Sequence, residues 1–393
     1  MRFLSLLISC LLVTPIMAQS PHSDFAKLCD SFDIAGASII AWTDSGVSLA
    51  CYHGWSQIDQ KIPVGPETRY RIASISKLAV ALVVMKQVEK GKLRLDDQIG
   101  DLLGYPVFHP IFPDLPITLR HLLQHTSGLA DGPEYVKFLR ATYAAENPAL
   151  AELIQGGGTE EMWTEAEPGT QFRYSNLGYG IIGAILERTL DARFDEVMKT
   201  ELLVPLGIQG SFNKASLPER KTLSTLYRRN EGEWVPQVDD WEVEPTLSKS
   251  HWESYQNGHN GIEFGPQGGL RVSAQELMEI GKLWLSWEGN ESGALLGKSH
   301  LAQMASESMR ISGQGAFKEY GLGLHITEAL IPGVRLIGHT GDAYGLHSML
   351  WVAPAEGKGF VVLLNSAEVK EGESGFYEVE EALANWIWGL MQN

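Results

Sequence analysis

The apolar, strand-like runs of this sequence gather near its two ends, which limits the folds that the chain can adopt. Near the N-terminus, residues 34–54 are typical of two strands joined by a turn at residues 43–46. Between the ends, the spacing of apolar residues is mostly helical. The other predicted strands are Val334–Ile337, Gly345–Ala353 and Phe360–Asn365, and the predicted helices are Pro21–Phe32, Ser76–Lys90, Leu119–His125, Asn176–Leu190, Ala274–Trp287 and Phe376–Met391.

This order of elements predicts a mixed α+β fold. An antiparallel sheet built from the N- and C-terminal segments would be flanked by the terminal helices, with a large helical insertion packed beside it. The sequence has no internal repeat and no low-complexity linker. We therefore expect one domain over residues 19–393, with an α/β region of about 22–75 and 310–393 and a mainly helical region of about 76–309. The cleft between the two regions is the natural place for a site.

The first residues have the pattern of a secretory signal peptide. Residues 1–18 contain one basic residue, an apolar run and a small residue, Ala18, at a plausible cleavage point. A lipoprotein box ending at Cys10 is the less favoured alternative, because the apolar run before it is short. No later segment approaches the ~18 uninterrupted apolar residues that a membrane span needs. We expect export to a bacterial periplasm, or secretion, without stable membrane insertion.

Charge and histidine spacing narrow the possible partners. The formal net charge is −17, from 31 Lys and Arg against 48 Asp and Glu, which disfavours nucleic acid. His121 and His125 stand four residues apart, but the glutamate of H-E-x-x-H and a third ligand are missing, so we expect no metal. His125 and Ser127 are instead expected to fix a loop. The remaining partner is a small molecule, and the sequence leaves the oligomeric state open.

Two cysteines, Cys29 and Cys51, remain after the predicted signal peptide. An oxidising compartment would let them form a disulfide. That bridge would tie the first helix to the second strand and contribute ~3 kcal/mol to stability. Two buried thiols are the alternative, because the sequence does not give the separation of the Cα atoms.

A serine and a lysine three residues apart, Ser74 and Lys77, stand where the helical run of residues 76–90 begins. This spacing places both side chains on one side of a helix. The helix dipole disfavours positive charge there and pushes Lys77 toward the neutral amine that can take a proton from Ser74. A plain helix cap is the alternative for Ser74. Roughly one or two S-x-x-K matches are expected by chance, and Ser211–Lys214, with no helix after it, is one.

Two further segments offer partners for this pair. Tyr174 and Asn176 flank a serine just before a predicted helix. A phenol can relay protons where nearby cations lower its pKa, and an amide can orient Lys77 and bind a substrate carbonyl. The segment His339–Gly341 follows the end of a predicted strand, where Gly341 would let a substrate backbone approach and lie as an added strand.

Ser74-x-x-Lys77, Tyr174-Ser-Asn176 and His339-Thr340-Gly341 together resemble the active-site triplet of the penicillin-recognising serine hydrolases. The resemblance is to the group of class C β-lactamases, D-alanyl-D-alanine carboxypeptidases, D-aminopeptidases and β-lactamase-like esterases. It includes the phrases LLQHTSGL, GKLRLDDQI and GPQGGLRVSAQEL and extends over about residues 24–390.

The resemblance implies a β-lactamase/transpeptidase-like fold and an acyl-enzyme mechanism that needs no metal or organic cofactor. In this mechanism Ser74 is the nucleophile and Lys77 its base. Tyr174 protonates the leaving group and later activates the deacylating water, while Asn176 holds the acyl side. The backbone N–H groups of Ser74 and Asp342 form the oxyanion hole.

Two positions depart from the pattern of many β-lactamases. His339 stands in place of lysine, and a histidine is only partly charged near neutral pH, so it would hold a substrate carboxylate less firmly. Asp342 stands in place of threonine or serine and would repel a carboxylate if it faced the cleft. It could then receive a substrate amine, or be neutralised by Arg335; alternatively it turns away and bonds to local backbone.

These departures favour an esterase or a D-amino-acid peptidase or amidase over a D-alanyl-D-alanine carboxypeptidase. An efficient β-lactamase is favoured least. From a different class of function, the fold could be a non-catalytic module that binds cell-wall fragments, although such a module has no physical need for an amine behind its serine.

Overall fold

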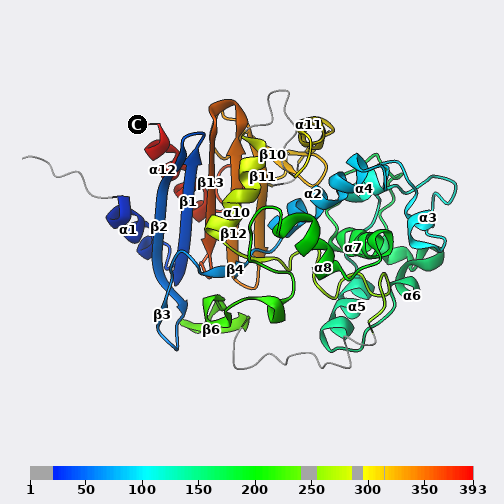
Figure 1. Ribbon diagram of the computed structural model, residues 1–393, viewed down its shortest axis with the longest axis horizontal. Coiled ribbons are helices and arrows are strands. Elements are labelled where there is room, and N and C mark those ends of the chain that lie inside the picture. The colour runs from blue at the N-terminus through cyan, green and yellow to red at the C-terminus, as the bar shows by residue number, and fades with distance from the viewer. Residues whose placement is uncertain (1–20, 240–254, 286–294, 314, 393) are drawn as a thin grey trace, which may run out of the picture.

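The computed structural model of the chain describes residues 21–239, 255–285, 295–313 and 315–392 (Figure 1). The predicted signal peptide, residues 1–18, and the last residues of the predicted helix Ala274–Trp287 lie outside this part of the chain. The α-helices are α1 (Pro21–Ser31), α2 (Ile75–Glu89), α3 (Ile99–Leu103), α4 (Leu119–Leu123), α5 (Pro133–Tyr143), α6 (Leu150–Ile154), α7 (Asn176–Leu190), α8 (Phe194–Met198), α10 (Ala274–Gly281), α11 (Lys298–Ser306) and α12 (Glu378–Met391).

The described residues form one large antiparallel sheet of nine strands, in the order β3-β2-β1-β13-β12-β11-β10-β9-β8. Its centre joins the two ends of the chain, because the N-terminal strand β1 pairs with the C-terminal strand β13. The predicted α+β fold, with a sheet built from both terminal segments, is therefore confirmed. The strands are β1 (Gly36–Thr43), β2 (Gly46–Gln57), β3 (Ile62–Pro63), β8 (Met309–Arg310), β9 (Glu319–Tyr320), β10 (His325–Thr327), β11 (Leu336–Ala343), β12 (Leu346–Ala353) and β13 (Lys358–Leu364).

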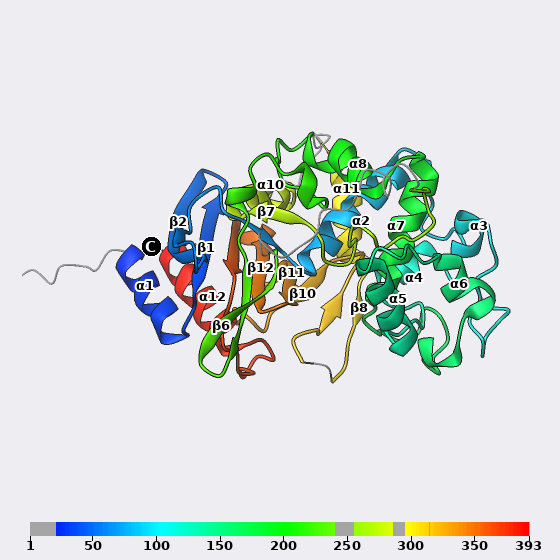
Figure 2. The same cartoon turned by 90° about the horizontal axis from the view of Figure 1, so that it is seen from below.

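Both faces of the sheet are covered, which explains why its central strands are apolar at nearly every position. Alternate side chains point to opposite faces. Ile39 of β1 packs with Phe25 of α1 and Leu383 of α12 in one core, whereas its neighbour Ile40 belongs to the core on the opposite face, with Leu78 of α2. Figure 2 shows the sheet lying between the terminal helices on one side and α10 on the other.

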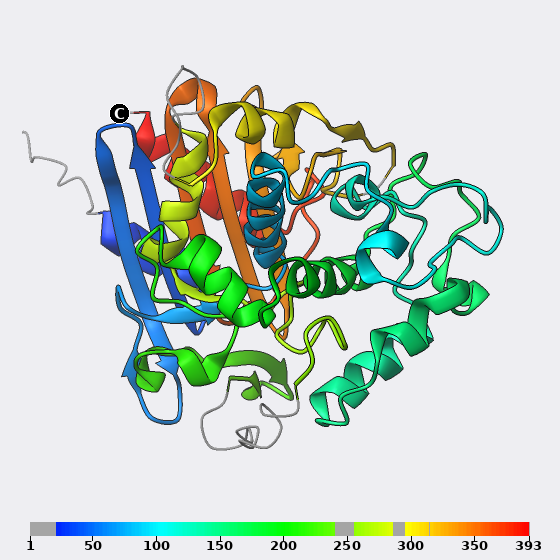
Figure 3. The same ribbon diagram turned by 45° about the vertical axis from the view of Figure 1, so that its right-hand side comes forward.

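The terminal helices lie beside one another, as the predicted architecture requires. The rings of Phe25 in α1 and Trp386 in α12 are stacked with their centroids 5.7 Å apart. On the opposite face, α10 packs on β1, β12 and β13 although it falls within the range predicted as the helical region. Helix α2 contacts β11, β12 and α7, so it stands between the sheet and the helical region (Figure 3).

The prediction that strands return only near the C-terminus is wrong. Strand β4 (Arg69–Arg71) pairs with β7 (Arg271–Ser273), and β5 (Leu226–Asn230) pairs with β6 (Glu233–Val238). These strands are short, and their polar residues hide the period-2 pattern. The β4–β7 ladder brings distant segments together immediately before α2 begins.

The predicted end of one strand is also wrong. Strand β11 continues to Ala343, whereas the sequence predicted a strand ending at Ile337. The polar residues of its second half do not resemble a buried strand, but they pair with β12 from Ile337↔Val352 to Ala343↔Leu346. The His-Thr-Gly segment therefore lies within a strand and not after one.

The two cysteines are free thiols, and the disulfide that we considered is not formed. Cys29 of α1 and Cys51 of β2 are both fully buried in the core between the terminal helices and the sheet. Burial raises the pKa of both thiols, that of Cys51 to about 11. They act here as small apolar side chains. No helix in the described residues is long and apolar enough to span a bilayer.

Candidate active site

Ser74 lies at the junction of β4 and α2, directly before the first helical residue. Ala73 before it has a φ of +47°, a conformation that is unfavourable for alanine and turns the chain sharply into the helix. The Ser74 side chain makes no capping hydrogen bond to the start of α2, so the plain helix-cap interpretation does not hold. Its Oγ instead accepts a hydrogen bond from Lys77 Nζ at 3.1 Å.

Lys77 is fully buried one turn into α2, whereas Ser74 is partly exposed. Its Nζ also donates to Asn176 Oδ1 at 2.8 Å and to the backbone oxygen of Gln267 at 2.6 Å. Burial lowers the pKa of Lys77 to about 7, against the opposing effect of the Asp131 carboxylate. The sequence analysis predicted a neutral amine because of the helix dipole. In the structure, the main cause of the lowered pKa is that burial removes water from the amine.

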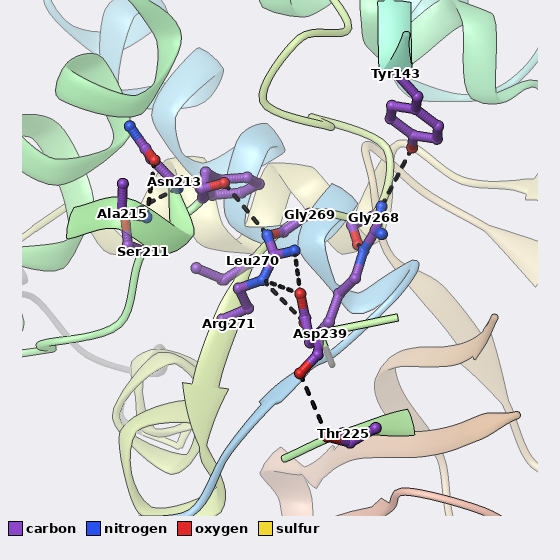
Figure 4. Close-up of polar contacts among 12 residues, drawn as sticks. Tyr143, Ser211, Asn213, Ala215, Thr225, Asp239, Gly268, Gly269, Leu270 and Arg271 are labelled. Atoms are coloured by element: carbon purple, nitrogen blue, oxygen red, sulfur yellow. Dashed lines mark hydrogen bonds and ion pairs between the residues drawn. The ribbon is translucent and has the colours of Figure 1, made fainter. Parts of the chain in front are cut away.

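The loop that contacts Lys77 is held through three consecutive backbone carbonyl groups, each of which accepts a hydrogen bond. Besides the bond from Lys77 to Gln267, Arg71 Nε donates to the oxygen of Gly268 at 3.0 Å and Arg271 Nη1 donates to that of Gly269 at 2.9 Å. Arg271 is itself paired with the buried Asp239 at 2.7 Å (Figure 4). The oxygen that orients the Lys77 amine is therefore fixed by a buried ionic network.

Asp131 is a functional residue that the sequence reasoning missed. Its carboxylate accepts hydrogen bonds from the backbone N–H groups of Asn176 and Leu177 and from the Ser175 hydroxyl, all at the start of α7. It also accepts from Asn176 Nδ2 at 2.7 Å, which leaves Asn176 Oδ1 to face Lys77. In the sequence, the available signal for Asp131 was its position, two residues after the HTSGL segment.

Tyr174 lines the same pocket as Ser74, and the Ser74 hydroxyl is near enough to act on the pKa of the phenol, so the predicted serine, lysine and tyrosine meet. Its ring lies 4.8 Å from Lys77 Nζ. The condition that nearby cations lower the pKa of this phenol is not met: burial raises the pKa, and the Asp131 carboxylate adds to the increase. Tyr174 is therefore a neutral phenol that can donate and accept a proton within one relay.

His125 fixes the segment that carries Tyr174 and Asn176. Its Nδ1 accepts from the backbone N–H of Ser175 at 3.2 Å, and its ring packs 4.3 Å from that of Tyr174. Burial keeps the pKa of His125 well below its usual value, so the ring is neutral. His121, the other member of the pair, accepts from the backbone N–H of Thr118. The described residues contain no cluster of three or more potential metal ligands.

The second half of β11 lies beside Ser74 with one edge uncovered. Strand β10 pairs with β11 only from Leu336 to Gly338, so among the described strands no partner follows along His339–Ala343 on that side. Gly341 also has a packing role that the sequence did not predict. A Cβ there would lie 2.4 Å from the backbone oxygen of Ile72, so glycine is needed for β11 to pack against the chain before α2.

His339 is neutral and not partly charged as we expected. It is fully buried, with Nδ1 against the Thr340 carbonyl and Nε2 2.9 Å from the Tyr320 hydroxyl. Because a carbonyl only accepts, the proton lies on Nδ1 and Nε2 accepts from Tyr320. Burial holds the pKa of His339 well below its usual value. Tyr320, which fixes the ring, carried no sequence signal.

Asp342 lines the pocket beside Ser74, and among the described residues its carboxylate has a side-chain donor and no hydrogen bond from local backbone. Its Oδ2 accepts a hydrogen bond from the Tyr377 hydroxyl at 2.8 Å, across from β11 to the segment before α12. Arg335 does not neutralise it, because both terminal nitrogens of that guanidinium bind Glu319. His347, opposite Asp342 on β12, has its pKa lowered by burial.

These side chains surround a pocket of about 330 Å³. One side is formed by Ser74 and Tyr174, and another by residues of β11 and of the start of α12. The arrangement brings a reachable hydroxyl, a buried amine near its neutral form and a neutral phenol to one point, which are the parts that nucleophilic catalysis by serine requires. The full lining set is Ser74, Tyr174, Ala316, Phe317, His339, Thr340, Asp342, Gly375, Phe376, Tyr377 and Glu380.

Known proteins resemble this chain in sequence and in fold. Penicillin-binding protein 4* of Bacillus subtilis (strain 168) is 30% identical over 178 residues, which cover 43% of this chain and 37% of that relative. The chain thus matches little more than a third of that relative's length. The octameric penicillin-binding protein homologue from Pyrococcus abyssi superposes with a TM-score of 0.71 and 25% identity, covering 93% of this chain and 76% of that one.

A second solved structure, the D-amino acid amidase from Ochrobactrum anthropi SV3 complexed with L-phenylalanine amide, has a TM-score of 0.68. It is 16% identical and covers 94% of this chain and 97% of its own, so it shows likeness of fold alone. The family model described as Beta-lactamase matches residues 22–384. The chain therefore belongs to the beta-lactamase family, whose members are serine hydrolases.

Proposed function

We propose that the protein is an exported hydrolase that cleaves an ester or amide bond through an acyl-enzyme on Ser74. The observation that carries the proposal is the 3.1 Å contact between Ser74 Oγ and a buried Lys77 amine whose pKa is lowered to about 7. Near neutral pH a large share of this amine is unprotonated and able to take the serine proton. Export rests on the signal-like pattern of residues 1–18.

The proposed reaction has two steps. Ser74 Oγ attacks the substrate carbonyl carbon while its proton passes to Lys77 Nζ. The bond to the leaving group breaks as Tyr174 gives that group a proton, and Lys77 returns a proton to Tyr174 along the relay. A water molecule then attacks the acyl ester, loses its proton to the same relay and restores the Ser74 hydroxyl as the acid product leaves.

The carbonyl oxygen becomes negative in both steps and needs hydrogen-bond donors. We assign this role to the backbone N–H groups of Ser74, at the free start of α2, and of Asp342, in the uncovered half of β11. Donors of this kind contribute about 3–4 kcal/mol each to other hydrolases. Asn176, oriented by Asp131, holds the acyl side.

The charges around the pocket favour esters and D-amino-acid amides or peptides over substrates with a terminal carboxylate. His339 is neutral and Asp342 is acidic, so nothing that they supply would attract a carboxylate. A D-alanyl-D-alanine carboxypeptidase or a weak β-lactamase is less favoured for the same reason.

Covalent labelling tests the proposal. The purified protein should react with a fluorophosphonate probe, and Ser74→Ala should abolish the label. Ser211→Ala is the matched control, because Ser211 begins the second S-x-x-K match but is largely buried and accepts a hydrogen bond from the Asn213 N–H. A folded wild type that is not labelled by this probe or by a fluorescent penicillin would favour the non-catalytic binding module.

A further inference from the structure

The pocket beside Ser74 carries two carboxylates and, among its lining residues, no lysine or arginine. Asp342 comes from the end of β11, and Glu380 from the first turn of α12. Tyr377, which precedes α12, lies between them: its hydroxyl binds Asp342 and its backbone N–H binds Glu380 Oε2 at 3.0 Å. The two acids thus form one built group on the side of the pocket that belongs to α12.

Glu380 is an unusual residue to find in this position. Only 5% of it is exposed, yet it lines the pocket, and the contacts among the described residues give one of its two oxygens a hydrogen-bond partner. Burial, with Asp342 and Glu381 nearby, raises the pKa of Glu380 to about 7. A buried carboxylate without a counter-charge is unfavourable. A cation in the pocket would supply that charge.

The other walls suit a cation that carries carbon substituents. Phe317, Phe376, Tyr174 and Tyr377 contribute aromatic rings to the lining. Aromatic faces attract ammonium groups, and more strongly where water is excluded. Asp342 makes no ion pair among the described residues, so its charge remains available to a ligand.

The position of the pocket shows which part of a substrate it receives. Tyr174 lines it, whereas Asn176 does not. Under the proposed function Tyr174 protonates the leaving group and Asn176 holds the acyl side. The pocket is therefore on the side of the leaving group.

We propose that this protein prefers esters or amides whose leaving group carries an ammonium group, such as an amino alcohol or a diamine, and that Asp342 and Glu380 are its specificity-determining residues. This inference rests on the proposed acyl-enzyme function. The cation is held between the two carboxylates and the surrounding rings, which places the scissile carbonyl at Ser74.

Three thioesters with one acyl group test the preference. Acetylthiocholine carries a trimethylammonium group, 3,3-dimethylbutyl thioacetate is its uncharged isostere, and S-acetyl-3-mercaptopropionate carries a carboxylate. Release of thiol gives kcat/KM for each. We expect the cationic substrate to exceed the neutral one by about tenfold, and the anionic one to be slowest.

The variants Asp342→Asn and Glu380→Gln keep the size and the hydrogen-bond acceptors of both side chains, so the bond from Tyr377 and the start of α12 are retained. Each should lower the preference for the cation, and the double variant should bring the ratio of cationic to neutral kcat/KM to within about twofold, with the neutral substrate little affected. Glu378→Gln is the matched control: it removes the same charge from the same helical turn, but Glu378 is exposed and outside the pocket lining.

The outcomes separate the two proposals. If the neutral thioester is cleaved in a Ser74-dependent manner but the cationic one shows no advantage, or keeps it in the double variant, the ammonium subsite is refuted and the hydrolase remains. If none of the three substrates is cleaved and no probe labels Ser74, the proposed function is refuted and this inference with it. Loss of the preference in Glu378→Gln as well would assign it to the general negative charge of α12 and overturn the subsite.

Discussion

Lys77→Met should change the pH dependence of stability in a way that can be calculated from the site. Lys77 is fully buried, and its pKa falls from an ordinary value of 10.5 to about 7 on folding. Between these two pH values the unfolded chain holds a proton on this amine that the folded chain has released, so the free energy of unfolding of the wild type rises with pH. The penalty of burying the amine is greatest below pH 7 and disappears above pH 10.5.

The size of the effect follows from linkage. One pKa unit corresponds to about 1.4 kcal/mol, so the penalty is on the order of 4 kcal/mol at pH 7 and 2 kcal/mol at pH 9. Methionine has no proton to lose. The difference in free energy of unfolding, wild type minus Lys77→Met, should therefore increase by about 2 kcal/mol from pH 7 to pH 9.

Urea unfolding of both proteins at several pH values measures this difference directly. Methionine also removes the hydrogen bonds to Asn176 and to the oxygen of Gln267, but that loss is the same at each pH and cancels in the comparison. A difference that stays flat between pH 7 and pH 9 would show that the amine keeps an ordinary pKa when buried. The assignment of Lys77 as the base would then lose its physical foundation.

Three further predictions follow from the site. Tyr174→Phe should reduce kcat/KM by at least about 100-fold with little change in Tm. A reduction of kcat/KM by less than threefold would exclude a proton relay through the phenol. Asp131→Asn removes the charge that opposes the lowering of the Lys77 pKa. The acid limb of the pH profile of kcat/KM should therefore move to lower pH, and the free energy of unfolding should fall by about 1–3 kcal/mol. An acid limb that does not move would contradict this effect of Asp131 on Lys77. The Glu380 carboxyl, which has Asp342, Glu381 and Tyr377 near it, is neutral below its raised pKa of about 7 and charged above it. The ratio of cationic to neutral kcat/KM should therefore rise from pH 6 to pH 8. It should not change with pH in Glu380→Gln, and the same rise in that variant would assign the effect to another group.

The sequence was most informative where a single local pattern determines the structure. The helix predicted at Asn176–Leu190 has those bounds, and Ser74, Lys77 and Tyr174 come together as their types and order implied. The pairing of the first and last strands followed from the placement of apolar runs at both ends of the chain.

What the sequence did not show depends on contacts between distant segments. Asp131 matters because a loop folds back onto the start of α7, and this contact joins segments that are 45 residues apart in the sequence. The charge of His339 was misjudged for a related reason: its burial beside Tyr320 keeps the ring neutral. The packing of Gly341 against Ile72 also depends on a contact between distant segments. Burial is a property of the fold and is not visible in a motif.

The distribution of charge around Ser74 follows one physical logic. Burial lowers the pKa of Lys77, and the Asp131 carboxylate opposes this effect without cancelling it. The carboxylate itself is occupied by hydrogen-bond donors at the start of α7. The nearby histidine rings, His125 and His339, are neutral because of the same burial. The carboxylates that line the pocket are on its α12 side, and under the proposals above they act on the substrate and not on the base. An ammonium group bound there would also disfavour protonation of Lys77, so binding of a cationic substrate and activation of the nucleophile would support each other.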